Sequence, residues 1–251
     1  MSERTLVFTA EDGGALKASW RSPEGVGPFP AILCVHGLTL TRAQFESFSG
    51  TLVARGLACF RMDLRGHGES EGRLQDQGFE AQCSDVRKGV EALAGLPGVD
   101  PGRMGLLGFS MGGAMAARVA QVVSVKALAL WSPLLKTSLW SGKRHDEFGA
   151  PKDGLRPIWD GLWVNERLFT EAMADEPLGV ALAWPGPLLV CHGGKDKNHP
   201  QSASLELAQG RVAAKLSVAS YFPPDSGHAW HPDGDRHLRD ELSAAFFSAV
   251  L

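Results

Sequence analysis

The chain has 251 residues, of which 44% are hydrophobic and 21% are charged, and its formal net charge is −3. These values are typical of a soluble globular protein with a large core, and they exclude a strongly basic surface that would recruit nucleic acid or an acidic membrane. Because the first residues hold no apolar signal core and no apolar run approaches the length of a membrane span, we expect a cytoplasmic protein without stable membrane insertion.

Strand and helix patterns alternate along most of the chain. Thr5–Thr9 and Leu16–Arg21 predict an N-terminal hairpin. Further strands are expected at Ala31–Val35, Leu57–Met62, Met104–Phe109, Val125–Trp131, Leu188–Cys191 and Lys215–Ala219. Helices are expected at Arg42–Arg55, Phe79–Leu96, Met111–Val122, Gln201–Gln209 and Arg236–Val250. Apolar strands separated by helices indicate an α/β protein whose eight-stranded, mostly parallel sheet is covered by helices on both faces.

The four cysteines are expected to be buried thiols. Cys34, Cys59 and Cys191 lie in predicted strands, and with Cys83 they share no spacing typical of metal ligands. A disulfide framework is not expected in such a chain.

The alternation breaks between Ser132 and about Pro187, where no clear strand is visible and Trp and Pro are frequent. A loop of this length normally has structure or function of its own, and aromatic side chains need burial. We therefore expect a small, partly helical cap at residues 133–185, inserted into a core formed by residues 1–132 and 186–251. The alternative is a loose excursion packed on the side of the sheet.

The most informative motif is Gly108-Phe109-Ser110-Met111-Gly112-Gly113, which directly follows an apolar strand. A G-x-S-x-G pattern between a strand and a helix of small residues is typical of a nucleophile elbow. Its glycines allow the strained turn that lifts a serine hydroxyl off the sheet, and the helix N-terminus favours an oxyanion. We predict that Ser110 is the nucleophile of an acyl-transfer reaction; the alternative is an ordinary turn into a helix.

A serine hydroxyl needs a base that removes its proton and an acidic group that orients the base. Asp196 and His228 each follow a predicted strand, so both fall at the carboxyl edge of the sheet beside Ser110. Their order along the chain is also the order expected after such an elbow. We predict Asp196 as the acid and His228 as the base. The competing residues are Asp225, Asp233 and Asp235 among the acids and His192, His199 and His231 among the histidines.

The oxyanion formed on the substrate needs two N–H donors. We expect one from the main chain of Met111, directly after the nucleophile, and the other from Leu38 in the loop that begins at His36. Gly37 permits an unusual backbone in this loop, and His36 is expected to be a structural hydrogen-bonding residue. The alternative is a simple turn that ends the strand.

The segment Asp63-Leu64-Arg65-Gly66-His67-Gly68-Glu69-Ser70 is dense in charged and titratable groups. A metal site or a second acid–base pair would use such residues. The spacing of its glycines favours instead a tight, hydrogen-bonded loop beside the entrance of the active site.

Together these motifs resemble the α/β-hydrolase superfamily, in the family's order and over nearly the whole chain. The segments that carry the resemblance are Val35-His36-Gly37, Asp63–Ser70, Gly108–Gly113, His192–Asp196 and Gly227-His228. Within the superfamily the chain is most similar to serine esterases of the cinnamoyl or feruloyl esterase and monoacylglycerol-lipase-like groups. Feruloyl esterases tend to carry an aromatic residue and then a glycine in the loop His36–Leu40, which this chain does not. The serine nucleophile argues against haloalkane dehalogenases and epoxide hydrolases, whose members use Asp.

The residues and the resemblance predict a serine hydrolase that cleaves carboxylic esters through an acyl-enzyme intermediate. Its partner would be a small-molecule ester, and the reaction needs no metal or organic cofactor. The cap would select the substrate, and its aromatic residues would line a pocket or form the cap's own core. The pocket candidates are Trp140, Trp159, Trp163 and Trp230, together with Phe148 and Phe169.

Three alternatives stay open. Peptidases, thioesterases, lactonases and acyltransferases use the same kind of triad. A binding protein could keep the fold without catalysis, although the intact set Ser110, Asp196 and His228 argues against it. The cap could also serve mainly as the interface of a homodimer.

Overall fold

The computed structural model describes residues 3–137, 151–159, 161–174 and 176–251. Its main layer is an eight-stranded sheet with the strand order β1-β2-β4-β3-β5-β6-β9-β10. The strands are β1 (Glu3–Thr9), β2 (Ala15–Arg21), β3 (Phe29–Val35), β4 (Ala58–Met62), β5 (Val99–Phe109), β6 (Ala127–Trp131), β9 (Leu188–Cys191) and β10 (Val218–Tyr221). The hairpin β1–β2 and the pair β2–β4 are antiparallel, and all other neighbours in this sheet are parallel. The predicted eight-stranded, mostly parallel sheet is therefore confirmed.

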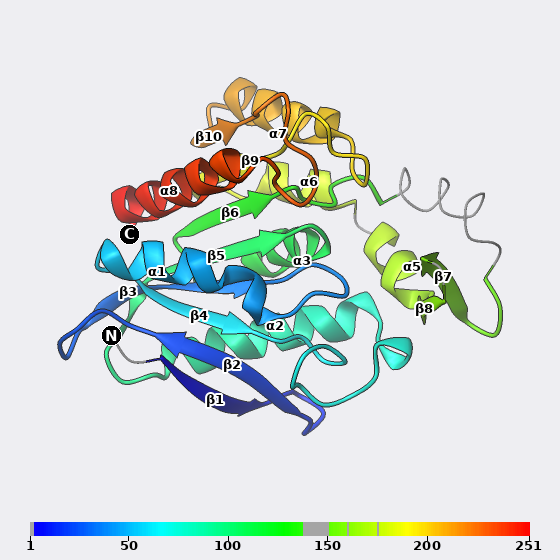
Figure 1. Cartoon of the computed structure of the whole chain (residues 1–251), viewed down its shortest axis with the longest axis horizontal. Coiled ribbons are helices and arrows are strands. Elements are labelled where there is room, and N and C mark those ends of the chain that lie inside the picture. Colours follow the sequence, from blue (N-terminus) through cyan, green and yellow to red (C-terminus); the bar gives the residue numbers. More distant parts are fainter. Residues whose placement is uncertain (1–2, 138–150, 160, 175) are drawn as a thin grey trace.

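Helices cover both faces of the sheet (Figure 1). On one face lie α1 (Glu46–Ala54) and α8 (Asp233–Val250), which contact each other. On the other face lie α2 (Phe79–Ala94), α3 (Met111–Ala120), α6 (Pro177–Ala183) and α7 (Gln201–Ala213). Two short 3-10 turns complete the core, η1 (Arg42–Phe45) and η2 (Leu74–Asp76). The predicted helix Arg42–Arg55 thus begins as a 3-10 turn and becomes α-helical at Glu46.

The core has two halves, one on each face of the sheet. Successive residues of a strand point to opposite faces, so Leu33 packs in the half that contains α2 and α3, and Ile32 packs in the half that contains α1 and α8. A strand that is buried on both faces needs an uninterrupted apolar run, which explains the sequence of β3. All four cysteines are buried free thiols, as expected.

The predicted start of the last strand, Lys215, is too early in the sequence. The sequence stretch Lys215–Ala219 forms a strand only from Val218 onward. Lys215 takes a left-handed backbone conformation, with φ of 57°, where α7 ends. The chain changes direction at Lys215, directly after α7, so the strand starts three positions later than predicted, at Val218.

The segment between β6 and β9 contains two strands that the sequence reasoning missed. β7 (Leu155–Trp159) and β8 (Leu162–Asn165) form an antiparallel hairpin separate from the main sheet. Pro157 weakens the strand pattern of β7, whereas the dipeptide Asp160-Gly161 between the strands is typical of a hairpin turn. The expectation of a segment without strands is therefore wrong.

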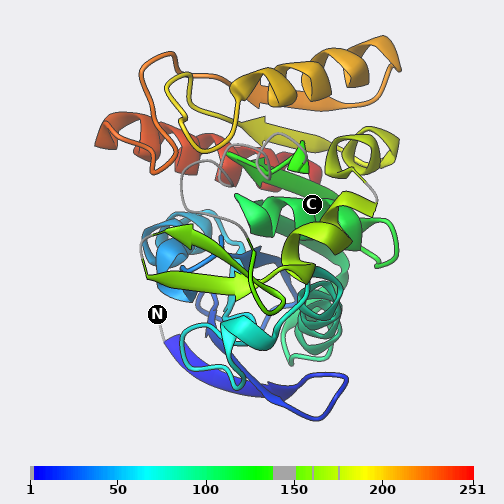
Figure 2. The same ribbon diagram turned by 90° about the vertical axis from the view of Figure 1, so that its right-hand side faces the viewer.

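The hairpin and α5 (Arg167–Ala174) lie at the end of the sheet toward which the arrowheads of the central strands point (Figures 1 and 2). α5 packs against α2, and α6 packs against α3 and α7 over the sheet. Both helices contribute buried residues to the main core, Phe169 from α5 and Leu178 from α6 among them. Within the described residues no helix is long and apolar enough to cross a membrane.

Candidate active site

The turn from β5 into α3 holds Ser110 in a strained conformation. β5 ends at Phe109 and α3 begins at Met111, so a single residue, with φ of 56° and ψ of −120°, reverses the chain. A side chain at Gly108 would collide with the carbonyl of Gly112, and one at Gly112 would collide with the carbonyl of His36. The glycines of the motif are therefore required by close packing of backbone, and the turn presents the Ser110 hydroxyl at the carboxyl end of the sheet.

The structure brings the three predicted chemical groups into one hydrogen-bonded chain. Ser110 Oγ lies 3.1 Å from His228 Nε2, and His228 Nδ1 lies 2.7 Å from Asp196 Oδ2. Asp196 follows β9, and His228 lies in the loop between β10 and α8. These loops are 32 residues apart along the chain but leave neighbouring parallel strands, so the register of the sheet sets their proximity.

The side chain of Asp196 is buried and is held as a carboxylate. Burial opposes ionisation, but hydrogen bonds from His192 and His228 and from the main-chain N–H of His199 outweigh it, so the pKa of Asp196 stays well below its usual range. The second oxygen, Oδ1, accepts the N–H groups of Asn198 at 2.8 Å and His199 at 2.9 Å. An ionised carboxylate at this position orients the His228 ring and stabilises its charged form.

The competing acids lie elsewhere. Asp225 is exposed and pairs with Lys195, at 2.7 Å between Nζ and Oδ1. Asp233 contacts Arg236, and Asp235 accepts hydrogen bonds from the hydroxyls of Tyr221 and Ser226. Asp233 thus bonds within the first turn of α8, whereas Asp225 and Asp235 connect this part of the chain to Lys195 and to Tyr221.

A second histidine approaches the serine. His199 Nε2 lies 3.1 Å from Ser110 Oγ, the same distance as His228 Nε2, and His199 is 5% exposed. The sequence by itself identifies His199 only as a competing base. The signal that could have placed it is the turn in which Asp196 bonds the N–H three residues later, because that turn brings His199 back toward the sheet edge.

His192 is a second hydrogen-bond partner of the Asp196 carboxylate. Its Nε2 lies 3.0 Å from Asp196 Oδ2 and 3.3 Å from the His199 carbonyl, and its Nδ1 lies 2.7 Å from Ser204 Oγ. Since both the carboxylate and the carbonyl only accept hydrogen bonds, Nε2 carries the proton and Nδ1 accepts the Ser204 hydroxyl. His192 is thus a buried structural residue.

The loop after β3 lies directly against the elbow. A Cβ atom at Gly37 would stand 3.1 Å from Ser110 Cβ, so any larger residue here would have to displace the loop or the elbow. Leu38 and Met111 both line the cavity that contains Ser110. Their position is compatible with the predicted roles of their N–H groups as oxyanion donors, which stay a proposal.

Two neutral histidines hold this loop in shape. His67 Nε2 accepts the N–H of Thr39 at 3.2 Å, and Thr39 has a left-handed backbone with φ of 66°. His36 Nε2 accepts the N–H of Leu64 at 3.1 Å, and its Nδ1–H donates to the Gly37 carbonyl at 2.8 Å. Burial lowers the pKa of both rings, that of His36 to about 3. His36 is therefore a structural hydrogen-bonding residue.

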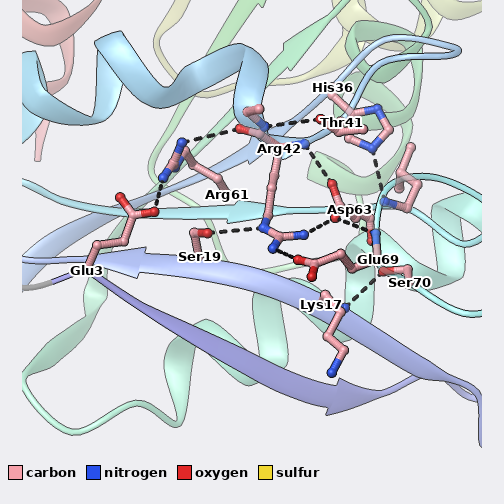
Figure 3. Close-up of polar contacts among 12 residues, drawn as sticks. Glu3, Lys17, Ser19, His36, Thr41, Arg42, Arg61, Asp63, Glu69 and Ser70 are labelled. Atoms are coloured by element: carbon pink, nitrogen blue, oxygen red, sulfur yellow. Dashed lines mark hydrogen bonds and ion pairs between the residues drawn. The ribbon is translucent and has the colours of Figure 1, made fainter.

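The segment Asp63–Ser70 anchors the other end of the loop (Figure 3). The buried carboxylate of Asp63 accepts the N–H of Arg42 at 2.7 Å and the N–H of Glu69 at 3.1 Å, and it also pairs with the Arg42 guanidinium. Arg42 reaches Glu69 and, at 3.1 Å, Ser19 Oγ as well. The segment is a hydrogen-bonded loop beside the site, as expected.

A cavity of about 710 Å³ opens beside Ser110. This volume is suited to a small organic molecule, and its wall is mainly apolar with a few polar groups. The apolar part of the wall includes Leu38, Leu40, Phe109, Met111, Leu134 and Trp230. The polar part includes Asn198, His199, His228, Arg236 and Arg239.

Only some of the predicted pocket residues lie at the cavity. Trp230 lines the cavity and is buried. Trp163 is half-buried in β8 and is not among the described residues around the cavity, while Phe169 is buried in the main core. Trp159 is described as the last residue of β7, and Trp140 and Phe148 lie outside the described residues.

Comparison with known sequences identifies relatives along most of the chain. The family model described as serine aminopeptidase, S33, matches residues 27–177. An uncharacterized protein of Mycobacterium tuberculosis is 34% identical over 226 residues, which cover 90% of this chain and 72% of that protein. Esterase FrsA of Escherichia fergusonii is 31% identical over 236 residues and 88% of this chain. The chain spans about half the length of this esterase, 54%.

Solved structures resemble the fold. Est1E from Butyrivibrio proteoclasticus, solved with ferulic acid bound, superposes with a TM-score of 0.83 at 20% identity, and the match covers 98% of each chain. The esterase domain of a Rhodothermus marinus protein superposes with a TM-score of 0.74 at 20% identity over 99% of each chain. At these identities the likeness concerns the fold.

Proposed function

The chain belongs to the S33 serine aminopeptidase family of α/β hydrolases, and we propose that it hydrolyses small carboxylic esters through a Ser110-His228-Asp196 triad. The observation that carries this proposal is the continuous hydrogen-bonded chain from Asp196 through His228 to the Ser110 hydroxyl, which ends in a largely apolar cavity. The same arrangement is what a serine hydroxyl needs in order to become a nucleophile at neutral pH.

In the first half of the proposed reaction, Ser110 Oγ attacks the ester carbonyl carbon while its proton passes to His228 Nε2. Negative charge develops on the carbonyl oxygen, and the N–H groups of Leu38 and Met111 are proposed to bind it. The intermediate then expels the alcohol, which takes the proton from His228. Asp196 stabilises the charged ring during both steps.

In the second half, water attacks the acyl carbon and gives a proton to His228. The bond between the acyl carbon and Ser110 Oγ breaks, the proton returns to the serine, and the carboxylic acid leaves. Every proton transfer in this scheme passes through His228 Nε2, the atom that lies 3.1 Å from Ser110 Oγ.

We further propose that residues 133–185 act as a cap that contributes to substrate selection. In support, the β7–β8 hairpin and α5 lie at the carboxyl end of the sheet (Figure 2). Ser110, which directly follows β5, stands at the same end. The hairpin, α5 and α6 all contribute buried residues to the main core, among them Ile158, Phe169 and Leu178, so this segment is fixed to the sheet domain.

The test is hydrolysis of p-nitrophenyl esters from acetate to palmitate by the wild type and by Ser110→Ala. We expect turnover in the wild type and a loss of at least about 10⁴-fold in the variant, with unchanged circular dichroism. The chain length with the highest kcat/KM would report the size of the acyl pocket. Equal turnover by both proteins would contradict the serine mechanism.

Peptide hydrolysis is the second candidate, because the matching family model is described as a serine aminopeptidase. Aminoacyl p-nitroanilides measured beside the esters separate the two activities. A higher kcat/KM for the anilides, abolished in Ser110→Ala, would assign the protein to the peptidases.

A further inference from the structure

Two histidine rings contact the Ser110 hydroxyl, one more than the proposed mechanism uses. The Nε2 atoms of His199 and His228 each lie 3.1 Å from Ser110 Oγ, and the two rings meet edge to face with centroids 4.9 Å apart. His199 lines the cavity but is almost entirely buried. Its ring therefore stands at the reacting oxygen itself, in surroundings where a hydrogen bond is strong.

The single hydrogen of the hydroxyl assigns the roles of the two rings. Asp196 accepts the Nδ1–H of His228, so in the neutral ring Nε2 carries the lone pair that receives the Ser110 hydrogen. Ser110 has no second hydrogen to offer. His199 Nε2 must therefore carry a hydrogen of its own and donate it to a lone pair of Ser110 Oγ.

The main chain around His199 fixes the ring at this place. The His199 N–H donates to Asp196 Oδ1 at 2.9 Å, and the His199 carbonyl accepts from His192 Nε2 at 3.3 Å. The carboxylate that orients His228 thus also positions the backbone of His199. A single acid places both rings on the serine.

Resting on the proposed function, we propose that His199 is a further catalytic residue whose Nε2–H stabilises the charge returning to Ser110 Oγ when the acyl-enzyme breaks down. In that step the bond between the acyl carbon and Oγ breaks and its electron pair moves to Oγ, which then takes the proton from His228. A donor on this oxygen lowers the energy of that charge build-up. The His199 hydrogen itself is not transferred.

The same donor has the opposite effect on the first step. During acylation, Oγ gives electron density to the acyl carbon, so a hydrogen bond to Oγ slightly weakens the attack. His199 therefore accelerates deacylation but not acylation. This asymmetry distinguishes it from a residue that only packs against the serine.

The test compares His199→Leu, which removes the donor, with His199→Gln, which keeps an N–H at a similar distance from Cβ. Steady-state turnover of p-nitrophenyl acetate is combined with intact-protein mass spectrometry of quenched samples, which measures the fraction of enzyme that carries an acetyl group. The deacylation rate is kcat divided by that fraction. We expect His199→Leu to slow deacylation by about 10- to 100-fold, with kcat/KM unchanged or slightly raised and a larger acetylated fraction. His199→Gln restores most of the deacylation rate.

Two results would overturn the inference. One is an equal fall in deacylation rate and kcat/KM in His199→Leu, and the other is a His199→Gln that behaves like His199→Leu. His199→Met is the second variant without a donor if the leucine variant does not fold by circular dichroism. A wild type with no Ser110-dependent turnover would overturn the proposed function, and this inference with it; a normal wild type with an unaffected His199→Leu overturns the inference alone.

Discussion

Gly37 and Ser110 are in contact across the gap between the loop after β3 and the elbow: a Cβ atom on Gly37 would stand 3.1 Å from Ser110 Cβ and 2.9 Å from Phe109 Cδ1. Gly37→Ala must therefore push the loop or the serine by a few tenths of an ångström. We expect ester kcat/KM to fall by about 10- to 100-fold, because small displacements of reacting groups have large effects on rate. Measured kcat/KM on p-nitrophenyl acetate checks this.

Gly179→Ala is the matched control for that substitution. A Cβ atom on this exposed helical glycine would meet nothing within 4 Å. Turnover should stay unchanged, and the free energy of unfolding should rise by about 0.5–1 kcal/mol, since alanine favours a helix. Full activity in Gly37→Ala would show that the loop moves aside without affecting the serine.

The acid assignment predicts unequal effects for two aspartates. Asp196→Asn removes the carboxylate that accepts His228 Nδ1–H, and an amide favours the wrong tautomer of the ring, so kcat should fall by about 10⁴-fold. Asp225→Asn affects only an exposed pair with Lys195 and should leave kcat within a factor of two or so. Steady-state kinetics on one ester settles the comparison, and similar losses in both variants would refute the assignment.

The buried ring of His36 predicts a stability that depends on pH. Burial and the neighbouring His67 ring lower the pKa of His36 to about 3, whereas the unfolded chain has a value of about 6.5. Between pH 6.5 and pH 3, His36 binds a proton in the unfolded state but not in the folded state. The stabilisation is thus complete above that pH and is lost progressively as the pH falls toward 3.

Between pH 7.5 and pH 5 this histidine should reduce the free energy of unfolding by about 2 kcal/mol. Urea denaturation at several pH values measures the change. In His36→Gln, where an amide oxygen can accept the Leu64 N–H, the decline over this range should be smaller by about that amount. Parallel curves for wild type and variant would mean that another group causes the decline.

The network in Figure 3 predicts a large difference between two arginines. Arg42→Ala leaves the fully buried carboxylate of Asp63 without its cation, and we expect a loss of about 3–5 kcal/mol in the free energy of unfolding. Arg73→Ala breaks an exposed pair with Asp76 at 4.0 Å and should cost less than about 0.5 kcal/mol. Chemical denaturation of both variants at neutral pH tests this, and comparable losses would show that Asp63 is supported by its main-chain partners alone.

The sequence alone was sufficient for the fold and for the three residues of the proposed triad. Apolar runs such as the one in β3 are long enough to be recognised locally, and the residues around Ser110 are constrained by a turn that few sequences satisfy. Asp196 and His228 followed from chain order, because consecutive parallel strands end at one edge of a sheet. These features depend on local chemistry and on a general rule of topology.

Other features depended on contacts between distant segments. The hairpin β7–β8 was missed because Pro157 interrupts its short pattern, and its stability comes from packing and not from local preference. The sequence also left His199 as one histidine among several. Its place beside Ser110 requires the turn closed by Asp196 and the pairing of β9 with β6. Ser110 and His199 are 89 residues apart along the chain, and β6 lies between the strands that precede them.

The sequence by itself thus determined the class of fold, the elbow and the order of the chemical groups, since each is encoded in a short segment or in chain order. Only the tertiary structure decided which side chains share the Ser110 hydroxyl and which aromatic residues reach the cavity. The physical reason is that a hydrogen bond needs its atoms within about 3 Å, and the packing of the whole sheet with its loops sets distances on that scale.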